Sequence, residues 1–171
     1  MLKTILLASA AVALLAAPSF AVNSANIAIT GSVAGVCSIT NATTSIDLGN
    51  LPVDATTGLY TGSQFSEPMT GTVWCNGTSN TVTAVANPLI TTAVTPLIGT
   101  FTNRIDYQLK INLVDWVTLD TASSPSVTIN SLAPFSYTSN QNSTITTENT
   151  TLPPIAGNYA GSVVITVTPG P

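Results

Sequence analysis

The sequence predicts an all-β protein built as an antiparallel sandwich, and three observations lead to this prediction. After residue 21, no stretch repeats its apolar residues with the 3.6-residue period of a helix. The strong helix formers Glu, Lys and Arg are scarce, because charged residues make up only 6% of the chain. Short runs that alternate apolar and polar residues are separated by Gly, Pro and Asn, which is typical of many short strands joined by turns.

The N-terminus has the three regions of a secretory signal peptide, which we place at residues 1–21. Lys3 supplies the charge, Thr4 to Ala17 form an apolar core, and small residues precede the expected cleavage after Ala21. The apolar core is shorter than the roughly 20 residues that a membrane-spanning helix needs, so we expect export without membrane insertion. About 150 residues would remain, enough for one domain with a real core.

Charge is sparse in the rest of the chain and mostly negative. Only Arg104 and Lys110 are basic, against seven acids, while Thr, Ser and Asn supply most polar groups. Nucleic acid and anionic membranes require a basic face on their partner, so neither is expected to bind this protein.

The stretch from Ala25 to Cys37 alternates like a strand with one face to bury. Ile27, Ile29 and Val33 lie on that face, Gly31 interrupts the row, and Cys37 falls on the same side. Such a strand could form the edge of the protein's own sheet, or it could be offered to another molecule.

The two cysteines, Cys37 and Cys75, are expected to form a disulfide because the chain is exported. A bond closing so long a loop would stabilise the fold by roughly 3 to 4 kcal/mol in the chain-entropy model. Two thiols in a chain with no His cannot by themselves make a zinc site, and their spacing is not that of a Cys-x-x-Cys redox pair.

The clearest strand is expected from Ile105 to Leu113, whose odd positions are all large and apolar and which we place in the centre of a sheet. Val114 to Leu119 should continue this strand or turn into its neighbour. Pro88 and Pro96 would allow only edge pairing between residues 88 and 100. Pro52 to Ser66 should be a polar loop, and we assign no strand to the Ser-, Asn- and Thr-rich stretch from Thr138 to Pro154. Further strands are expected at Ser45–Gly49, which runs into a turn, and at Met69–Cys75, Thr81–Ala86, Val127–Leu132, Phe135–Tyr137 and Tyr159–Thr168.

The chain offers little material for catalysis, and we expect neither an enzyme nor a cofactor. Without His there is no ordinary Ser-His-Asp or Cys-His arrangement. Asp115 and Asp120 could act as a glycosidase pair or hold calcium with a carbonyl, but they also suit the solvated ends of a strand. Trp74, Trp116 and the tyrosines could form a sugar-stacking platform, although packing or isolated surface positions explain them as well. Asn-x-Ser/Thr triplets begin at Asn41, Asn76, Asn142 and Asn149.

Several motifs together resemble the spore coat protein U domain family, which includes the pilin subunits of archaic chaperone-usher pili. The motifs cover nearly the whole mature chain: the β-rich segment ending in Cys37, Ile-Asp-Leu-Gly at residues 46–49, Gly-Thr-Val-Trp-Cys-Asn-Gly at 71–77, and Ala-Gly-Asn-Tyr at 156–159 before the final Val/Ile run.

The resemblance implies an immunoglobulin-like sandwich that lacks one strand, with residues 22–36 as a donor segment and 37–171 as the body. A periplasmic chaperone would fill the gap, an outer-membrane usher would receive the subunit, and the next copy's N-terminal segment would then replace the chaperone. Ile27, Ile29, Gly31 and Val33 would be the donor positions, and Val163, Ile165 and Val167 would line part of the acceptor groove. Family members often finish on an aromatic or apolar strand residue, whereas this chain ends in Pro-Gly-Pro, which leaves the end of its final strand open.

The sequence and the resemblance leave two alternative functions. In the first, the protein is a structural subunit of a surface fibre or coat that serves attachment or biofilm formation. In the second, it is a self-complete secreted sandwich that binds a glycan or another extracellular ligand, and Asn26 to Val33 pair within their own chain.

Overall fold

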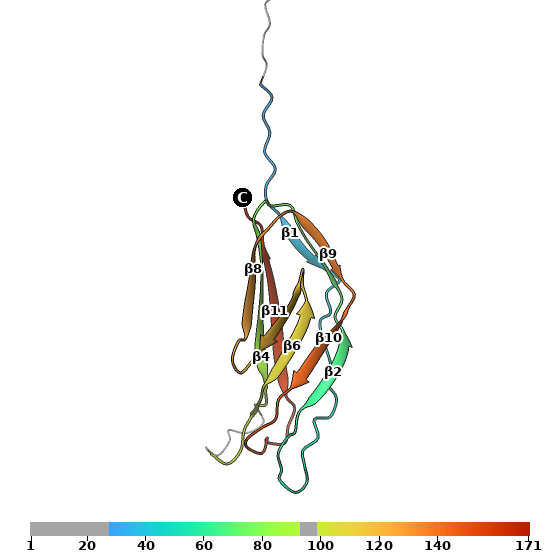
Figure 1. The fold of residues 1–171 in the computed structure, drawn as a ribbon, viewed down its shortest axis with the longest axis vertical. Helices are drawn as coiled ribbons and strands as arrows, with labels where there is room; N and C mark the ends of the chain where they lie inside the picture. The colour runs from blue at the N-terminus through green and yellow to red at the C-terminus, as the bar shows by residue number, and fades with distance from the viewer. Residues whose placement is uncertain (1–27, 93–98) are drawn as a thin grey trace, which may run out of the picture. The chain divides into compact units, whose positions relative to one another are not determined.

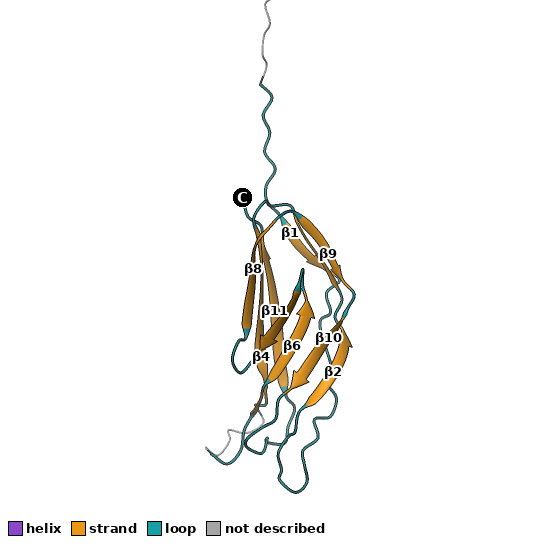
Figure 2. Ribbon diagram, viewed as in Figure 1, coloured by secondary structure: helices purple, strands orange, loops and turns teal. Residues whose placement is uncertain are grey.

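The computed structural model describes residues 28–92 and 99–171, which contain strands joined by turns and loops and no helix (Figures 1 and 2). Residues 33–171 form one compact unit, and residues 28–32 belong to a separate one. The predicted signal peptide and the donor position Ile27 lie outside the described residues. The strands are β1 (Cys37–Thr40), β2 (Ser63–Pro68), β3 (Gly71–Cys75), β4 (Asn80–Ile90), β5 (Arg104–Ile105), β6 (Tyr107–Asn112), β7 (Trp116–Asp120), β8 (Ser126–Leu132), β9 (Phe135–Ser139), β10 (Asn142–Thr147) and β11 (Ala160–Thr168).

The strands form three antiparallel sheets, which confirms the predicted all-β class. Their orders are β1-β3-β9, β2-β10-β6-β7 and β11-β4-β5, with β8 also pairing with β4. Alternate side chains of β4 and β6 meet in one core, where Val82 and Ala84 belong to the same buried cluster as Leu109 and Ile111. This packing of opposed sheets makes the body a β-sandwich.

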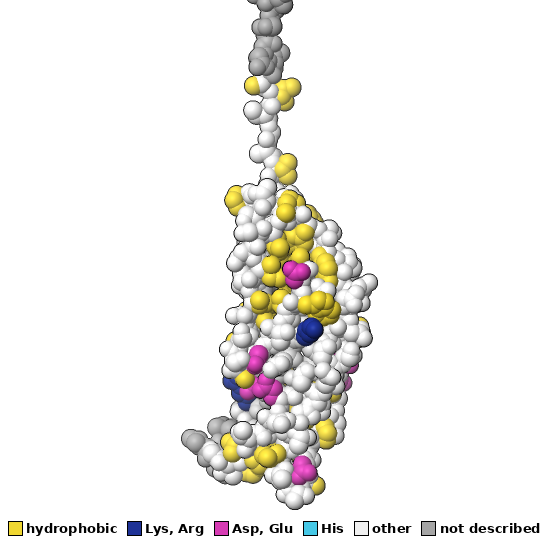
Figure 3. All heavy atoms as spheres, viewed as in Figure 1, with side chains coloured by type: hydrophobic (Ala, Val, Ile, Leu, Met, Phe, Trp, Pro, Cys, Tyr) yellow, Lys and Arg dark blue, Asp and Glu magenta, His cyan; other side chains and the backbone are white. Residues whose placement is uncertain are grey.

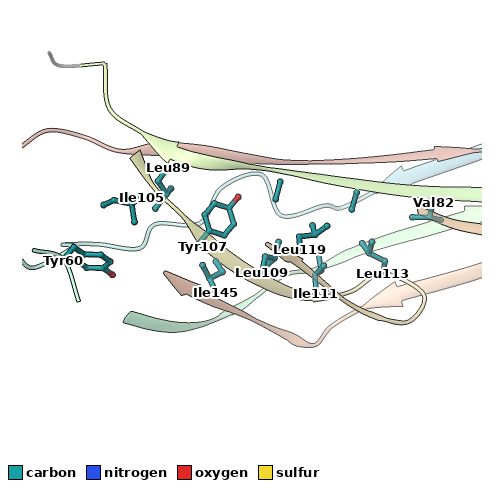
Figure 4. Close-up of a cluster of buried hydrophobic side chains, with 12 residues drawn as sticks. Tyr60, Val82, Leu89, Ile105, Tyr107, Leu109, Ile111, Leu113, Leu119 and Ile145 are labelled. Carbon is teal, nitrogen blue, oxygen red and sulfur yellow. The ribbon is translucent and has the colours of Figure 1, made fainter. Parts of the chain in front are cut away.

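The run from Ile105 to Leu113 is the centre of the core, as predicted. All five of its large apolar side chains are buried, and they follow one another along the close-up in Figure 4. The run is divided, however, because β5 pairs with β4 whereas β6 pairs with β7 and β10. Asp106 lies at the division and binds Arg104 in an ion pair of 2.6 Å. Residues 114–119 turn back into β7, so β6 and β7 form a hairpin.

The expectation that Pro88 allows only edge pairing is wrong. Pro88 lies within β4, which pairs with β11 on one side and with β5 and β8 on the other. The β4–β11 register shifts by one residue between Ser162 and Ala160, so a bulge at Pro88 accommodates the missing N–H. Gly161 fits against this bulge because a Cβ there would lie 2.8 Å from the Asn87 carbonyl oxygen.

Three other expectations need correction. Residues 45–49 form no strand, although the turn is present: the Gly49 N–H donates to Asp47 Oδ1 at 2.8 Å and Gly49 has a φ of 66°. The predicted polar loop contains the first part of β2, residues 63–66, and the polar stretch after residue 138 contains β10. Both strands were missed because each has a single large hydrophobic residue, Phe65 or Ile145, on its inward face.

Cys37 and Cys75 form the predicted disulfide, which joins two directly opposed residues of β1 and β3. The C-terminus lies at the same end of the body as the start of β1 (Figure 1). There the buried side chain of Asn80 donates to the carbonyl oxygens of Gly77 at 2.6 Å and Leu132 at 3.1 Å and accepts from the Gly170 N–H at 3.4 Å. Asn80 therefore ties the C-terminal tail to this end of the body.

Candidate functional site

An apolar groove lies beside β11 and holds a cavity of about 940 Å³. Its floor consists of core side chains that start on β4, β5, β6 and β10, and its walls are the residues 43–51 and 154–163. The floor is therefore the inner face of the sandwich, reached from one side. The floor residues are Leu89, Ile105, Tyr107, Leu109 and Ile145, all labelled in Figure 4.

A smaller cavity of about 60 Å³ continues this groove towards β1 and β3. Thr43 and Met69 line both cavities, so the two are neighbours. Ile39 of β1 and Ile165 of β11 both line the smaller one, so edge strands of two different sheets border the same space. Asn112 also lines it, and its buried Oδ1 has no hydrogen-bond partner among the described residues.

β11 runs along this groove with one edge unpaired. Within the described residues it pairs only with β4, and likewise β1 pairs only with β3. Val163 lines the larger cavity and Ile165 lines the smaller one. Val167 lines neither cavity, although it packs against the core. Of the three residues proposed for an acceptor groove, two therefore line cavities, while their proposed role stays a prediction.

The groove is lined almost entirely by uncharged side chains. Asp47 is the charged residue among the described side chains that line the larger cavity, and it is exposed. Burial raises the pKa values of Tyr107 and Tyr159, so both phenols stay neutral at physiological pH. The Tyr159 hydroxyl donates to the Ile155 carbonyl oxygen at 2.9 Å. Charged groups are also sparse on the face of the molecule drawn in Figure 3. The groove therefore suits an uncharged, apolar occupant.

The segment before β1 carries large apolar side chains that are exposed. Ile29 is 94% exposed and Val33 is 88% exposed, and a Cβ at Gly31 would meet nothing within 4 Å. Residues 28–36 form no strand in this chain, so the strand expected over this stretch is absent from its described part. Alternation creates a face to bury, but an extended segment becomes a strand only when a neighbouring strand pairs with it.

Residues 34–36 are the part of this segment that the body holds. The Asn76 side chain accepts from the Val36 N–H at 2.6 Å and donates to the Ala34 carbonyl oxygen at 3.1 Å. In the sequence, Asn76 stood out only as the start of an Asn-x-Ser/Thr triplet and as part of the motif at residues 71–77, and nothing indicated that it contacts a segment 40 residues earlier.

The structure does not bring together the carboxylate pair or the aromatic platform that the sequence suggested. Asp115 and Asp120 lie at opposite ends of β7, and Asp120 accepts from the Ala122 N–H at 2.8 Å and from the Ser123 hydroxyl at 2.8 Å. These bonds, led by the Ser123 hydroxyl, lower the pKa of Asp120, which is the behaviour of a turn-capping carboxylate. Trp74 and Trp116 lie in different sheets, and Lys110 Nζ lies 5.4 Å from the Trp116 ring centroid.

Two further features are absent from the described part of the chain. No group of three or more His, Cys, Asp or Glu residues there could hold a metal ion. None of its segments is a helix long and apolar enough to cross a membrane.

Comparisons with known proteins add no identification. No protein-family model matches the chain, and no curated protein has a significantly similar sequence.

Proposed function

We propose that this protein is a structural subunit of an extracellular fibre or coat, assembled by donor-strand complementation through a chaperone and an usher. The observation that carries the proposal is that β11 pairs on one edge only, within the described residues, and lies beside an apolar groove of about 940 Å³. The same chain has an N-terminal segment whose alternate apolar side chains are exposed. Both features support a model in which the groove of one copy accepts the N-terminal segment of the next.

The chemistry of segment and groove matches. Burying one large aliphatic side chain contributes roughly 1.5 to 3 kcal/mol, so Ile27, Ile29 and Val33 together could contribute several kcal/mol. Gly31 would pass where the groove leaves no room for a side chain. Backbone N–H and C=O groups would pair with the free edge of β11, as in other cases of β-strand addition. Because each copy would give one strand and take one, the contact is head-to-tail and builds an open fibre.

The gap also explains why such a subunit would need a partner at every stage. An unpaired edge nine residues long is a template for wrong pairing. The buried, unpartnered Asn112 Oδ1 beside the smaller cavity costs free energy until a donor reaches it. A periplasmic chaperone strand would cover the groove in transit, and the next copy would cover it in the fibre.

The disulfide and the sequence motifs agree with this route. A Cys37–Cys75 bond fits an oxidising compartment, as expected for an exported protein. The motifs at residues 46–49, 71–77 and 156–159 resemble those of the spore coat protein U domain family. We infer passage through the periplasm to the cell surface, where such fibres would serve attachment or biofilm formation.

Paired substitutions test the proposal. Ile29→Asp in the donor should abolish polymer formation by the purified chain, because a carboxylate cannot enter an apolar groove. Thr30→Asp changes the adjacent, oppositely directed position and should polymerise normally. On the acceptor side, Ile165→Asp should abolish polymers, whereas Val164→Asp, at a position that is 52% exposed, should not. Polymers are measured by sedimentation and electron microscopy.

The proposal has clear contrary results. Deleting residues 22–33 should leave a subunit that still binds its chaperone but cannot enter fibres, and normal assembly of this deletion variant would refute the donor role. A stable monomer that neither polymerises nor captures a peptide of residues 25–36 would instead favour the self-complete, ligand-binding sandwich.

A further inference from the structure

Asn76 extends the β1–β3 ladder beyond the last residue of β3. Its backbone N–H donates to the Val36 carbonyl oxygen at 3.1 Å, next to the Cys37–Cys75 pair. Its side-chain amide then bonds to the Val36 N–H and to the Ala34 carbonyl oxygen. The Asn76 side chain thus supplies one acceptor and one donor, as the backbone of a neighbouring strand would. Residues 34–36 are thereby held as an extension of β1 towards the N-terminus.

The C-terminal tail packs on the same residues. A Cβ at Gly35 would lie 3.1 Å from both the Gly170 carbonyl oxygen and the Pro169 Cβ, so the two segments are in close contact. The tail is itself held, because the Thr78 N–H donates to the Pro171 carbonyl oxygen at 3.3 Å. Residues 34–36 therefore lie between Asn76 and the tail.

These contacts matter because the chain's own segment is the nearest competitor for its groove. β1 has one free edge among the described strands, and its Ile39 lines the smaller cavity. Residues 34–36 number three and include Gly35, which is enough for a hairpin loop that would bring the segment back alongside β1. A tethered segment has an effective concentration of about millimolar, far above that of another copy in dilute solution. Without a restraint, folding back would defeat polymerisation.

We propose that Asn76, together with the Pro169–Gly170 tail, holds residues 34–36 in line with β1 and so keeps the donor segment out of its own groove. The groove is thereby reserved for a second copy of the chain. This inference rests on the proposed function and assigns Asn76 a positioning role, since it touches neither cavity.

The test uses the full chain and a fluorescent synthetic peptide of residues 25–36 as the probe. Asn76→Ala removes two hydrogen bonds, which should favour the folded-back form by about tenfold and weaken peptide capture by a similar factor. Hydrogen exchange of the amides of residues 27–33 should become slower in the same variant. Asn76→Asp keeps the acceptor for Val36 but loses the donor to Ala34, so its effect should be intermediate. Asn140→Ala, in the β9–β10 turn, is the matched control and should behave as wild type.

A second background separates this role from damage to the groove. In an Ile29→Asp/Val33→Asp chain, the segment cannot enter any apolar groove, so adding Asn76→Ala should leave peptide capture unchanged. Equal capture and exchange by Asn76→Ala and wild type would overturn the inference, and so would a loss of capture in both backgrounds. No peptide capture by the Ile29→Asp/Val33→Asp chain itself would overturn the proposed function, and this inference would fall with it.

Discussion

Removing the disulfide should destabilise the body through its unfolded state. The bond joins residues 38 apart, and the chain-entropy model gives about 4 kcal/mol for a loop of that length at 25 °C. Cys37 and Cys75 are already opposed in the β1–β3 register, so the bond adds little to the contacts of the folded chain. We therefore expect Cys37→Ala/Cys75→Ala to lower the free energy of unfolding by about 4 kcal/mol. For a chain of this size, the loss corresponds to a fall in Tm of about 10 °C.

Urea unfolding followed by Trp fluorescence measures the loss, and the wild-type chain under reducing conditions is the control. The reduced wild type should match the double variant within about 1 kcal/mol, because both lack the same constraint. Amide exchange should also quicken in β1, which has four residues and pairs only with β3 among the described strands. A double variant that loses less than about 1 kcal/mol would refute the loop-entropy reasoning.

Three further predictions concern the body. Leu109→Ala, at a position that is 1% exposed, should cost about 2 to 5 kcal/mol in urea unfolding, and a cost under 1 kcal/mol would mean that the groove floor is not packed core. Asn80→Ala should lower the Tm and speed exchange of the Gly170 amide, because it leaves buried carbonyl oxygens unpaired; unchanged exchange would disprove this anchoring. Burial, followed by repulsion from Asp120 and Asp106, raises the pKa of Glu148, so this residue adds stability below its unfolded pKa and loses it as the pH rises through the folded one. Glu148→Gln should accordingly raise the free energy of unfolding at pH 7 by less than about 1 kcal/mol, seen as a slightly higher Tm. An equal gain at pH 3 would contradict the assignment.

The strands that sequence could predict are those whose large side chains mark the buried face. β6 and its flanks present five such residues in alternate positions, and β11 presents three, so both were found. β10 buries Ser143, Ile145 and Thr147 on its inward face, and two small polar residues do not distinguish a strand from a polar loop. Burial of Ser and Thr is decided by their neighbours in space, which a single sequence does not contain.

The same limit applies to the groove. The alternation of Ile46 and Leu48 favoured a strand, yet these side chains pack on the core from an irregular segment that forms a groove wall. That β11 is a strand was predictable from its pattern, whereas its free edge depends on which of the described strands pair with it. Asn76 was unpredictable for a related reason, since its partners lie 40 and 42 residues away in sequence.

The single ion pair of the described residues, Arg104 with Asp106, has a wider consequence for where this protein can work. Its other described polar contacts are mostly between hydroxyls, amides and backbone groups, which salt screens very little. The stability of the body should therefore hardly change between fresh water and brine.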